Sequence, residues 1–263
     1  MDNLICDSID ADILIFGSSR AHQQYYPKIF MDSLNMSCYN CGSSGMGILY
    51  HYGRWRMISK RHIPRVVVYD VLPVLDMMVR DDNVIFINPL RRYYGKDSLV
   101  DRLFYEVDSN ERLKMLSNTY RYHSSIMGLV SDYRNATVYE DGFEVVTAKM
   151  PKDDALAVTE KVDYEVDSLK LQYLEQFILE TKDKIKLIFV ASPRWGYQTS
   201  GKAFEPLLEL CAKYNIPFID HYCDSTFNTN PELFSNESHM NVYGADVWSK
   251  EIASEIKKLL IFN

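Results

Sequence analysis

The chain has 263 residues, of which 47% are hydrophobic and 25% charged, and its formal net charge is −7 at neutral pH. A chain of this length can bury a sizeable core, either as one large α/β domain or as two small ones. The acidic balance argues against nucleic acid or an anionic lipid surface as a partner. No apolar run approaches the roughly 18 residues of a membrane-spanning helix.

Five strand-like runs lie at residues 13–16, 37–40, 65–70, 186–191 and 217–220. Helical patterns lie between and after them, at residues 20–34, 45–61, 165–182, 202–214 and 244–260. The nearly continuous apolar character of three of the strands is typical of parallel strands covered on both faces. This alternation predicts a three-layer α/β/α fold around a doubly wound, mostly parallel, five-stranded sheet. Functional residues of such sheets gather at the carboxyl ends of the strands.

The stretch from about Leu75 to Asp163 interrupts the alternation. It contains aromatic and basic clusters such as "PLRRYYGKDS", a helical pattern across residues 109–130 and a short β-like piece, "YEDGFEVV". We interpret this stretch as a mainly helical insertion over one end of the sheet. On this interpretation residues 1–263 form a single domain.

The first predicted strand runs directly into Gly17-Ser18-Ser19-Arg20. One interpretation is structural, because a strand-to-helix turn needs only a flexible glycine and a capping serine. The other is a nucleophilic serine at the end of a strand, where backbone N–H groups can stabilise an oxyanion. A serine needs a base to accept its proton, so the second interpretation requires a histidine.

The chain has six histidines, and His239 is the strongest candidate for that base. It lies in a polar loop just before the last predicted helix, from which it can reach the end of the first strand. His22 follows Ser19 by one helical turn, and we expect it at the surface. For His51 and His62, packing or solvation is the default interpretation.

A glycine-rich loop, "CGSSGMG", follows the second predicted strand. Glycines suit a backbone that approaches another group closely. A dinucleotide fingerprint would need G-x-G-x-x-G after the first strand, whereas the spacing here is G-x-x-G-x-G after the second. We therefore favour an oxyanion-hole N–H from Gly45 over nucleotide binding.

These three segments resemble the SGNH (GDSL-type) hydrolase superfamily. "FGSSRA" places Ser19 at the family's nucleophile, "NCGSSG" matches an N-x-x-x-S-G block that ends at Gly45, and "NESH" matches the D-x-x-H block with His239. The resemblance implies a flavodoxin-like fold, Ser19 as nucleophile, His239 as base and an oxyanion hole formed by Ser19 and Gly45. Some bacterial surface-polysaccharide proteins of this superfamily look similar, with G-S-S-R at the nucleophile and H-x-N-x-x-G-A near the end.

Two positions depart from the family pattern. Val74 stands about where the family has an oxyanion-hole asparagine, and losing one such donor costs roughly 2.7–4 kcal/mol. A guanidinium from Arg20 or Arg194 is a candidate replacement. Asn236 stands where the family has the aspartate that orients the histidine, a change that lowers turnover about 10⁴-fold in a well-studied serine protease.

The Asn236 substitution leaves three alternatives. The site is a Ser-His dyad in which Asn236 can only orient the ring, or it is a triad rescued by another carboxylate, or it has lost catalysis. The carboxylates considered for rescue are Glu237, Asp220 and Asp224.

The fourth predicted strand ends in "ASPRWGY" and opens onto the same edge of the sheet. Trp195 and Tyr197 are candidates to stack on a sugar ring, and Arg194, like Arg20, is a candidate substrate contact. The alternative is that these residues pack beneath the insertion.

The combined pattern predicts a serine esterase that removes acyl groups, acetyl above all, from a carbohydrate or other small ester. An O-acyltransferase acting on surface polysaccharide would use the same residues. A catalytically degenerate carbohydrate-binding or assembly protein is the non-enzymatic alternative, which the changes at Val74 and Asn236 favour.

Nothing in the sequence indicates a cofactor or a metal. The five cysteines are scattered, and we interpret Cys38 and Cys41, which form a C-x-x-C, as buried small apolar residues. A strand near residue 11 leaves no room for a signal peptide in this numbering. We expect the bacterial cell envelope if a leader or anchor was removed, and the cytoplasm otherwise.

Overall fold

The computed structural model describes residues 2–122, 139–150, 165–196 and 202–261. Its main sheet has five parallel strands in the order β2-β1-β3-β6-β7. These are β1 (Ile13–Gly17), β2 (Cys38–Asn40), β3 (Val66–Asp70), β6 (Lys186–Ala191) and β7 (Phe218–Asp220). Ile13 pairs with Cys38 on one side and with Val66 on the other, and Val66 pairs with Lys186. The sequence prediction of a doubly wound parallel sheet is confirmed.

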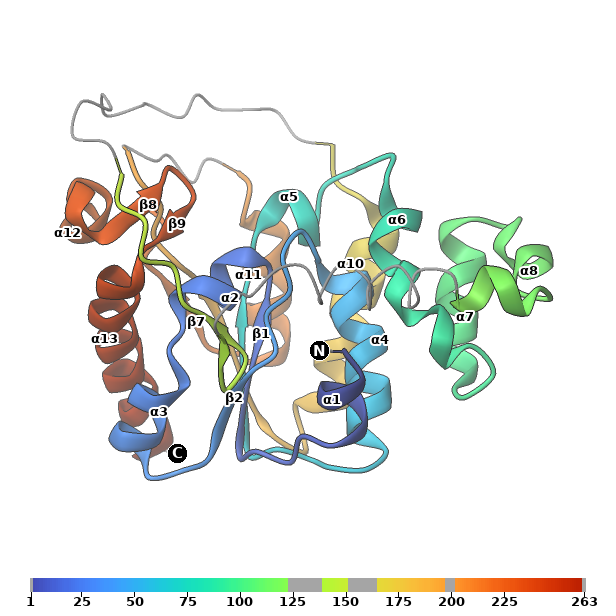
Figure 1. Cartoon of the computed structure of the whole chain (residues 1–263), viewed down its shortest axis with the longest axis horizontal. Coiled ribbons are helices and arrows are strands. Elements are labelled where there is room, and N and C mark those ends of the chain that lie inside the picture. Colours follow the sequence, from blue (N-terminus) through green and yellow to red (C-terminus); the bar gives the residue numbers. More distant parts are fainter. Residues whose placement is uncertain (1, 123–138, 151–164, 197–201, 262–263) are drawn as a thin grey trace.

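Helices cover both faces of this sheet (Figure 1). One face carries α1 (Asp2–Asp7), α4 (Ile48–Ser59), α10 (Ser168–Thr181) and α11 (Glu205–Tyr214). The other carries α2 (Ser19–Gln24), α3 (Pro27–Leu34) and α13 (Val242–Ile261). Alternate residues of β1 face opposite layers, so that Leu14 and Phe16 belong to the first core and Ile13 and Ile15 to the second.

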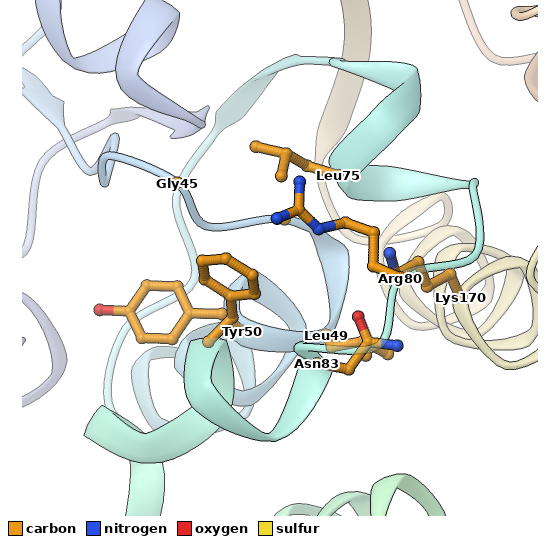
Figure 2. Close-up of a pocket in the computed structure, with 9 residues that line it drawn as sticks. Gly45, Leu49, Tyr50, Leu75, Arg80, Asn83 and Lys170 are labelled. Atoms are coloured by element: carbon orange, nitrogen blue, oxygen red, sulfur yellow. The ribbon is translucent and has the colours of Figure 1, made fainter.

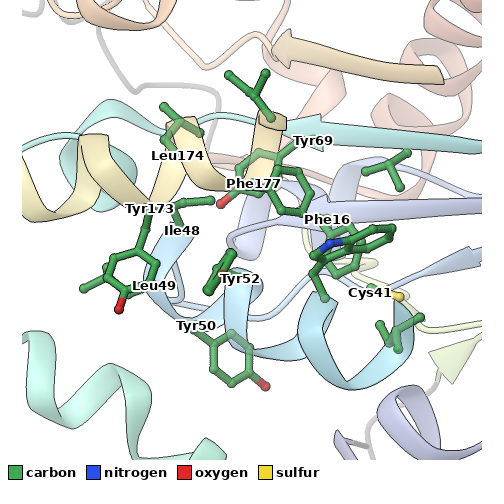
Figure 3. Packing of buried hydrophobic residues seen from close by; sticks show 14 of the residues in the cluster. Phe16, Cys41, Ile48, Leu49, Tyr50, Tyr52, Tyr69, Tyr173, Leu174 and Phe177 are labelled. Atoms are coloured by element: carbon green, nitrogen blue, oxygen red, sulfur yellow. The ribbon is translucent and has the colours of Figure 1, made fainter. Parts of the chain in front are cut away.

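The first core is rich in aromatic rings that contact one another edge to face. Phe16 of β1 and Tyr69 of β3 both pack against Phe177 of α10, with ring centroids 6.4 and 5.9 Å apart (Figure 3). Such contacts hold α10 and the sheet in a fixed orientation. The cysteine interpretation is also consistent with this packing, because the side chains of Cys38 and Cys41 are buried.

The predicted helix at residues 20–34 is two helices. α2 ends at Gln24 and α3 begins at Pro27. A proline disfavours helical geometry in the residue before it, and its ring suits the first position of a new helix. The break shortens α2 and lets Tyr25 turn inward, where its hydroxyl donates to Asp70 at 2.6 Å.

The stretch from Leu75 onward is mainly helical within the described residues, but a single helix over residues 109–130 is wrong. The structure has α5 (Pro73–Asp76), α6 (Asn83–Ile87), the 3-10 helix η1 (Asn88–Tyr93), α7 (Ser98–Val107) and α8 (Glu111–Lys114). Residues 118–122 form a further helical turn, and residues 123–130 lie outside the described part. α6, η1 and α7 contact α4, so this part lies beside one helical layer rather than over the end of the sheet (Figure 1).

The β-like piece of the same stretch is a hairpin of β4 (Tyr139–Glu140) and β5 (Phe143–Glu144), as predicted. The chain between β7 and α13 forms α12 (Ser225–Asn228), the 3-10 helix η2 (Pro231–Leu233) and a small antiparallel pair, β8 (Phe234–Asn236) and β9 (His239–Met240). No helix in the described ranges is long and apolar enough to cross a membrane.

Candidate active site

The side chains of Ser19 and His239 meet, although 220 positions separate them in the chain. Ser19 Oγ lies 2.7 Å from His239 Nε2, and His239 Nδ1 lies 3.0 Å from Asn236 Oδ1. Ser19 is the first residue of α2, and the other two residues belong to the β8–β9 turn that precedes α13. The last helix thus carries its preceding turn back to the end of the first strand.

The orientation of the Asn236 amide follows from its backbone partners. Its Oδ1 accepts the backbone N–H of Ser238 at 2.9 Å and that of His239 at 3.1 Å. Because both partners are donors, the oxygen and not the NH₂ group must occupy this position. The His239 ring then donates its Nδ1–H to Asn236, which leaves Nε2 as an acceptor for the Ser19 hydroxyl. Asn236 therefore selects the tautomer that a general base needs.

The charges around His239 favour its neutral form. Burial lowers the pKa of His239, the positive charges of Arg20 and Arg194 lower this pKa further, and Glu144 opposes them. A neutral imidazole at neutral pH can accept a proton from Ser19. The described partner of His239 Nδ1 is the neutral Asn236 amide, which cannot stabilise the imidazolium by charge as a carboxylate would.

The two serines of the strand-to-helix turn have different tasks. Ser18 is the N-cap of α2, where its hydroxyl accepts the N–H of Arg20, and only 1% of its surface is exposed. Ser19 presents its hydroxyl to His239 instead. Gly17 precedes them with φ of +136°, and a Cβ there would lie 2.6 Å from Asp70 O. Only glycine allows the turn to pass this close to β3.

The glycine-rich loop lies beside this turn. Ser43 N donates to Gly17 O at 3.0 Å, and the buried Asn40 amide donates to the carbonyls of Ala21 and Tyr25. Gly45 has φ of +76°, a left-handed conformation that favours glycine. The role of its N–H in an oxyanion hole stays a prediction.

A small cavity with room for about one water molecule lies on one side of Gly45 (Figure 2). Its lining includes the polar residues Arg80, Asn83 and Lys170. Leu49 and Tyr50 of α4 also line it. Arg80 forms an ion pair with Asp82, and Lys170 donates to Met78 O at 2.7 Å. Sequence reasoning gave no indication of this cavity, because its walls come from four separate segments.

Arg20 does not reach the mouth of the site, contrary to expectation. Its side chain is 3% exposed and donates to Val71 O at 2.8 Å and Ser192 O at 3.1 Å, with Asp70 at 3.5 Å. The guanidinium ties the ends of β3 and β6 together and partners a buried carboxylate. This structural role replaces the expected substrate contact and the expected oxyanion contact of Arg20.

The three candidates in "ASPRWGY" have different outcomes. Trp195 is 4% exposed and packs against Phe234 of β8, so its buried ring does not fit the expected stacking on a sugar. Arg194 is half-buried, and its charge acts on His239. Tyr197 lies outside the described residues.

The carboxylates considered for rescue of the triad lie elsewhere. Asp224 contacts His221 Nδ1 at 2.8 Å, and Asp220 accepts the N–H of Tyr222. Glu237 is exposed, and its backbone carbonyl accepts the N–H of Trp195. Val74, at the expected place of an asparagine, lies in α5 just beyond β3.

Two further residues near the site were not anticipated in their present place. His22 is buried instead of exposed and stacks on Tyr139 with ring centroids 5.5 Å apart. Glu144 of β5 contacts Gln23 of α2 at 2.7 Å. The sequence predicted the hairpin, but no local pattern shows which helix it packs against.

Comparisons with known proteins give distant likenesses only. No protein-family model and no curated protein sequence matches the chain. A family two carbohydrate esterase from Clostridium thermocellum, solved in complex with cellohexaose, is 11% identical with a TM-score of 0.44, and the match covers 94% of this chain and 64% of that one. The chain thus spans less than two thirds of that esterase.

A lipase/acylhydrolase from Enterococcus faecalis is 15% identical with a TM-score of 0.44, over 94% of this chain and 95% of that one. Likenesses this weak say nothing of the reaction.

Proposed function

We propose that this chain is a serine esterase-type hydrolase in which Ser19 is the nucleophile and His239 the general base. The observation that carries the proposal is the hydrogen-bonded series from Ser19 Oγ through the His239 ring to Asn236 Oδ1, at 2.7 and 3.0 Å. A hydroxyl, a correctly oriented imidazole and an acceptor behind it make up the machinery for acyl transfer.

In the first step Ser19 Oγ attacks the ester carbonyl carbon while its proton moves to His239 Nε2. The backbone N–H groups of Ser19 and Gly45 are the proposed donors to the oxyanion. When the tetrahedral intermediate collapses, the imidazolium returns the proton to the departing alkoxide, which leaves as an alcohol. Water then gives a proton to His239, attacks the acyl-enzyme and releases the carboxylic acid and free Ser19.

We propose acetylated carbohydrate as the substrate class. The support is the motif resemblance to surface-polysaccharide proteins, together with Arg194, whose charge lowers the pKa of His239 and which remains a candidate for substrate contact. The same residues would serve an O-acyltransferase if a sugar hydroxyl replaced water in the second step. We also propose that residues 1–263 form one domain, with residues 75–163 as an insertion.

A catalytically degenerate binding protein is the second candidate, and Asn236 is the observation that favours it. An amide orients His239 but gives the imidazolium no charge partner. A probe for activated serines separates the two candidates. We expect a fluorophosphonate to add one mass increment to the wild-type protein and none to Ser19→Ala.

Ser18→Ala is the matched control, because it removes the neighbouring hydroxyl and leaves Ser19 in place. We expect it to be labelled, with a loss of about 1 kcal/mol of stability from the missing helix cap. Equal labelling of Ser19→Ala and the wild type would remove Ser19 from the mechanism. A wild type that resists the probe and releases no acetate from acetylated oligosaccharides would favour the binding protein.

A further inference from the structure

The chain segment 139–150 is fixed beside the candidate active site at its hairpin end. Asn40 N of β2 donates to Asp141 O at 2.9 Å. Gly142 comes so close to the same strand that a Cβ would lie 2.0 Å from Asn40 O. Phe143 stacks on Tyr26, which follows α2, with ring centroids 4.9 Å apart. The hairpin therefore has a defined position against β2 and the end of α2.

The other end of segment 139–150 joins the turn that holds His239. Val242 N donates to Val146 O at 2.7 Å, and Met150 N donates to Phe234 O at 2.9 Å. These bonds lie on either side of the β8–β9 turn. The segment, yellow-green in Figure 1, thus connects α2, which carries the nucleophile, to the elements that carry the base.

Glu144 lies in the middle of this connection and faces α2. Its Oε2 accepts Gln23 Nε2 at 2.7 Å and lies 3.5 Å from His22 Nδ1. Residues 22 and 23 are three and four positions after Ser19, so they share one face of the helix with it. The carboxylate of Glu144 is therefore held above the face of α2 that presents the nucleophile.

Neither of the two described side chains that contact Glu144, Gln23 and His22, carries a positive charge at neutral pH. Gln23 is a neutral amide. Burial and the positive charge of Arg54 lower the pKa of His22. Glu144 raises this pKa, but by less, so the pKa lies below its usual value. His22 is then neutral at pH 7. The Glu144 side chain is 23% exposed, so its charge is only partly screened by solvent.

The charges of three groups affect the pKa of the His239 ring. Arg20 acts from α2, Arg194 from the loop after β6, and Glu144 from β5, and Glu144 is the anion among them. Within its own turn the ring meets the neutral amide of Asn236. Within the described part of the chain, Glu144 is the charged group that raises the pKa of this ring and so favours the imidazolium.

We propose that Glu144 is the positioning residue that supplies, through space, the negative charge that Asn236 cannot supply to His239. The inference rests on the proposed function. When Ser19 Oγ forms its bond to the ester carbon, its proton passes to Nε2 and the ring becomes cationic. A carboxylate fixed by Gln23 stabilises that cation without touching the reacting atoms.

The most direct test is the titration of His239 by NMR in the resting protein. The signal of His239 is identified among those of the six histidines by its loss in a His239→Gln variant. Glu144→Gln keeps an oxygen for the contact with Gln23 and removes the charge, so we expect the pKa of His239 to fall. Glu140→Gln is the matched control, because it removes another carboxylate of the same hairpin, one that accepts a hydrogen bond from the Tyr26 hydroxyl. We expect the pKa of His239 in this control variant to equal that of the wild type.

Adding Asn236→Asp to Glu144→Gln should raise the pKa of His239 again, because a carboxylate returns at the ring. An unchanged His239 titration in a folded Glu144→Gln protein would overturn the proposal. So would an equal shift in Glu140→Gln, because the effect would then belong to the hairpin and not to the Glu144 charge.

Kinetics give the second measurement. We expect Glu144→Gln to lower kcat for an aryl acetate up to about fivefold with KM nearly unchanged, the size of one partly exposed charge interaction. A fall in kcat accompanied by a rise in KM would indicate a structural role of Glu144 instead. Because the titration needs no turnover, failure of labelling at Ser19 would refute the proposed function separately from the charge coupling.

Discussion

Asn236→Asp tests how much the missing carboxylate costs this site. The aspartate can keep the three contacts that Asn236 Oδ1 now makes, with Ser238 N, His239 N and His239 Nδ1 at 2.9 to 3.1 Å. The variant therefore changes the charge and leaves the geometry. Stabilising the imidazolium should make the base stronger and raise kcat.

The size of the gain follows from what Asn236 already does. In the serine protease precedent, the asparagine variant loses about 10⁴-fold because the histidine takes the wrong tautomer. Here the two backbone N–H groups hold the amide oxygen toward the ring, so the tautomer is already correct. Only the charge interaction remains to be gained. Because Asn236 is exposed, solvent reduces that interaction to about 1–2 kcal/mol, or roughly 5- to 30-fold in kcat.

The assay is hydrolysis of a small aryl acetate between about pH 5 and 9, with the wild type and Ser19→Ala in parallel. The neutral form of His239 is the active base, and a carboxylate at position 236 raises its pKa. The acid limb of the pH profile should therefore move to higher pH while the plateau rises. A gain near 10⁴-fold would refute the inference that Asn236 already selects the tautomer, and no gain on the plateau would refute the expected charge interaction.

Two further predictions concern the frame around the site. Gly17→Ala should lower the free energy of unfolding by more than about 1 kcal/mol, because Gly17 has a positive φ and lies close to Asp70 O. Chemical denaturation measures this, and a variant as stable as the wild type would contradict the role assigned to Gly17. Burial opposes the charge of His221, but hydrogen bonds to Asp224 and Glu255 outweigh it and raise the pKa of His221. The stability that this raised pKa confers is fully present below the unfolded pKa of about 6.5 and is lost as pH rises through the folded value. The gap in unfolding free energy between wild type and His221→Gln should therefore narrow with rising pH, and a constant gap would refute the assignment.

The sheet could be predicted from the sequence because its signal is local. Runs such as residues 66–69 and 187–191 contain only apolar and aromatic side chains, which is typical of strands that are buried on both faces. The meeting of Ser19 with His239 also followed, since the order of elements brings the first strand end and the last helix start to the same edge.

The errors concern side chains whose environment depends on distant partners. Arg20 reads as a surface or ligand-binding residue, and only the fold reveals the buried Asp70 and the strand-end carbonyls that hold it. Trp195 follows a strand at the functional edge, yet packing against Phe234 turns it into the core. The place of Glu144 beside α2 could not be predicted for the same reason, because its contact partner Gln23 is 121 positions away in the chain.

The central claim is that Ser19 becomes acylated with His239 as its base. The most direct measurement is acid quenching during turnover of an activated aryl acetate, followed by peptide mass mapping. We expect an acetyl group on the peptide that contains Ser19, absent in Ser19→Ala and formed far more slowly in His239→Ala. Turnover with no acetyl group on Ser19, or acetylation at the same rate without His239, would contradict it.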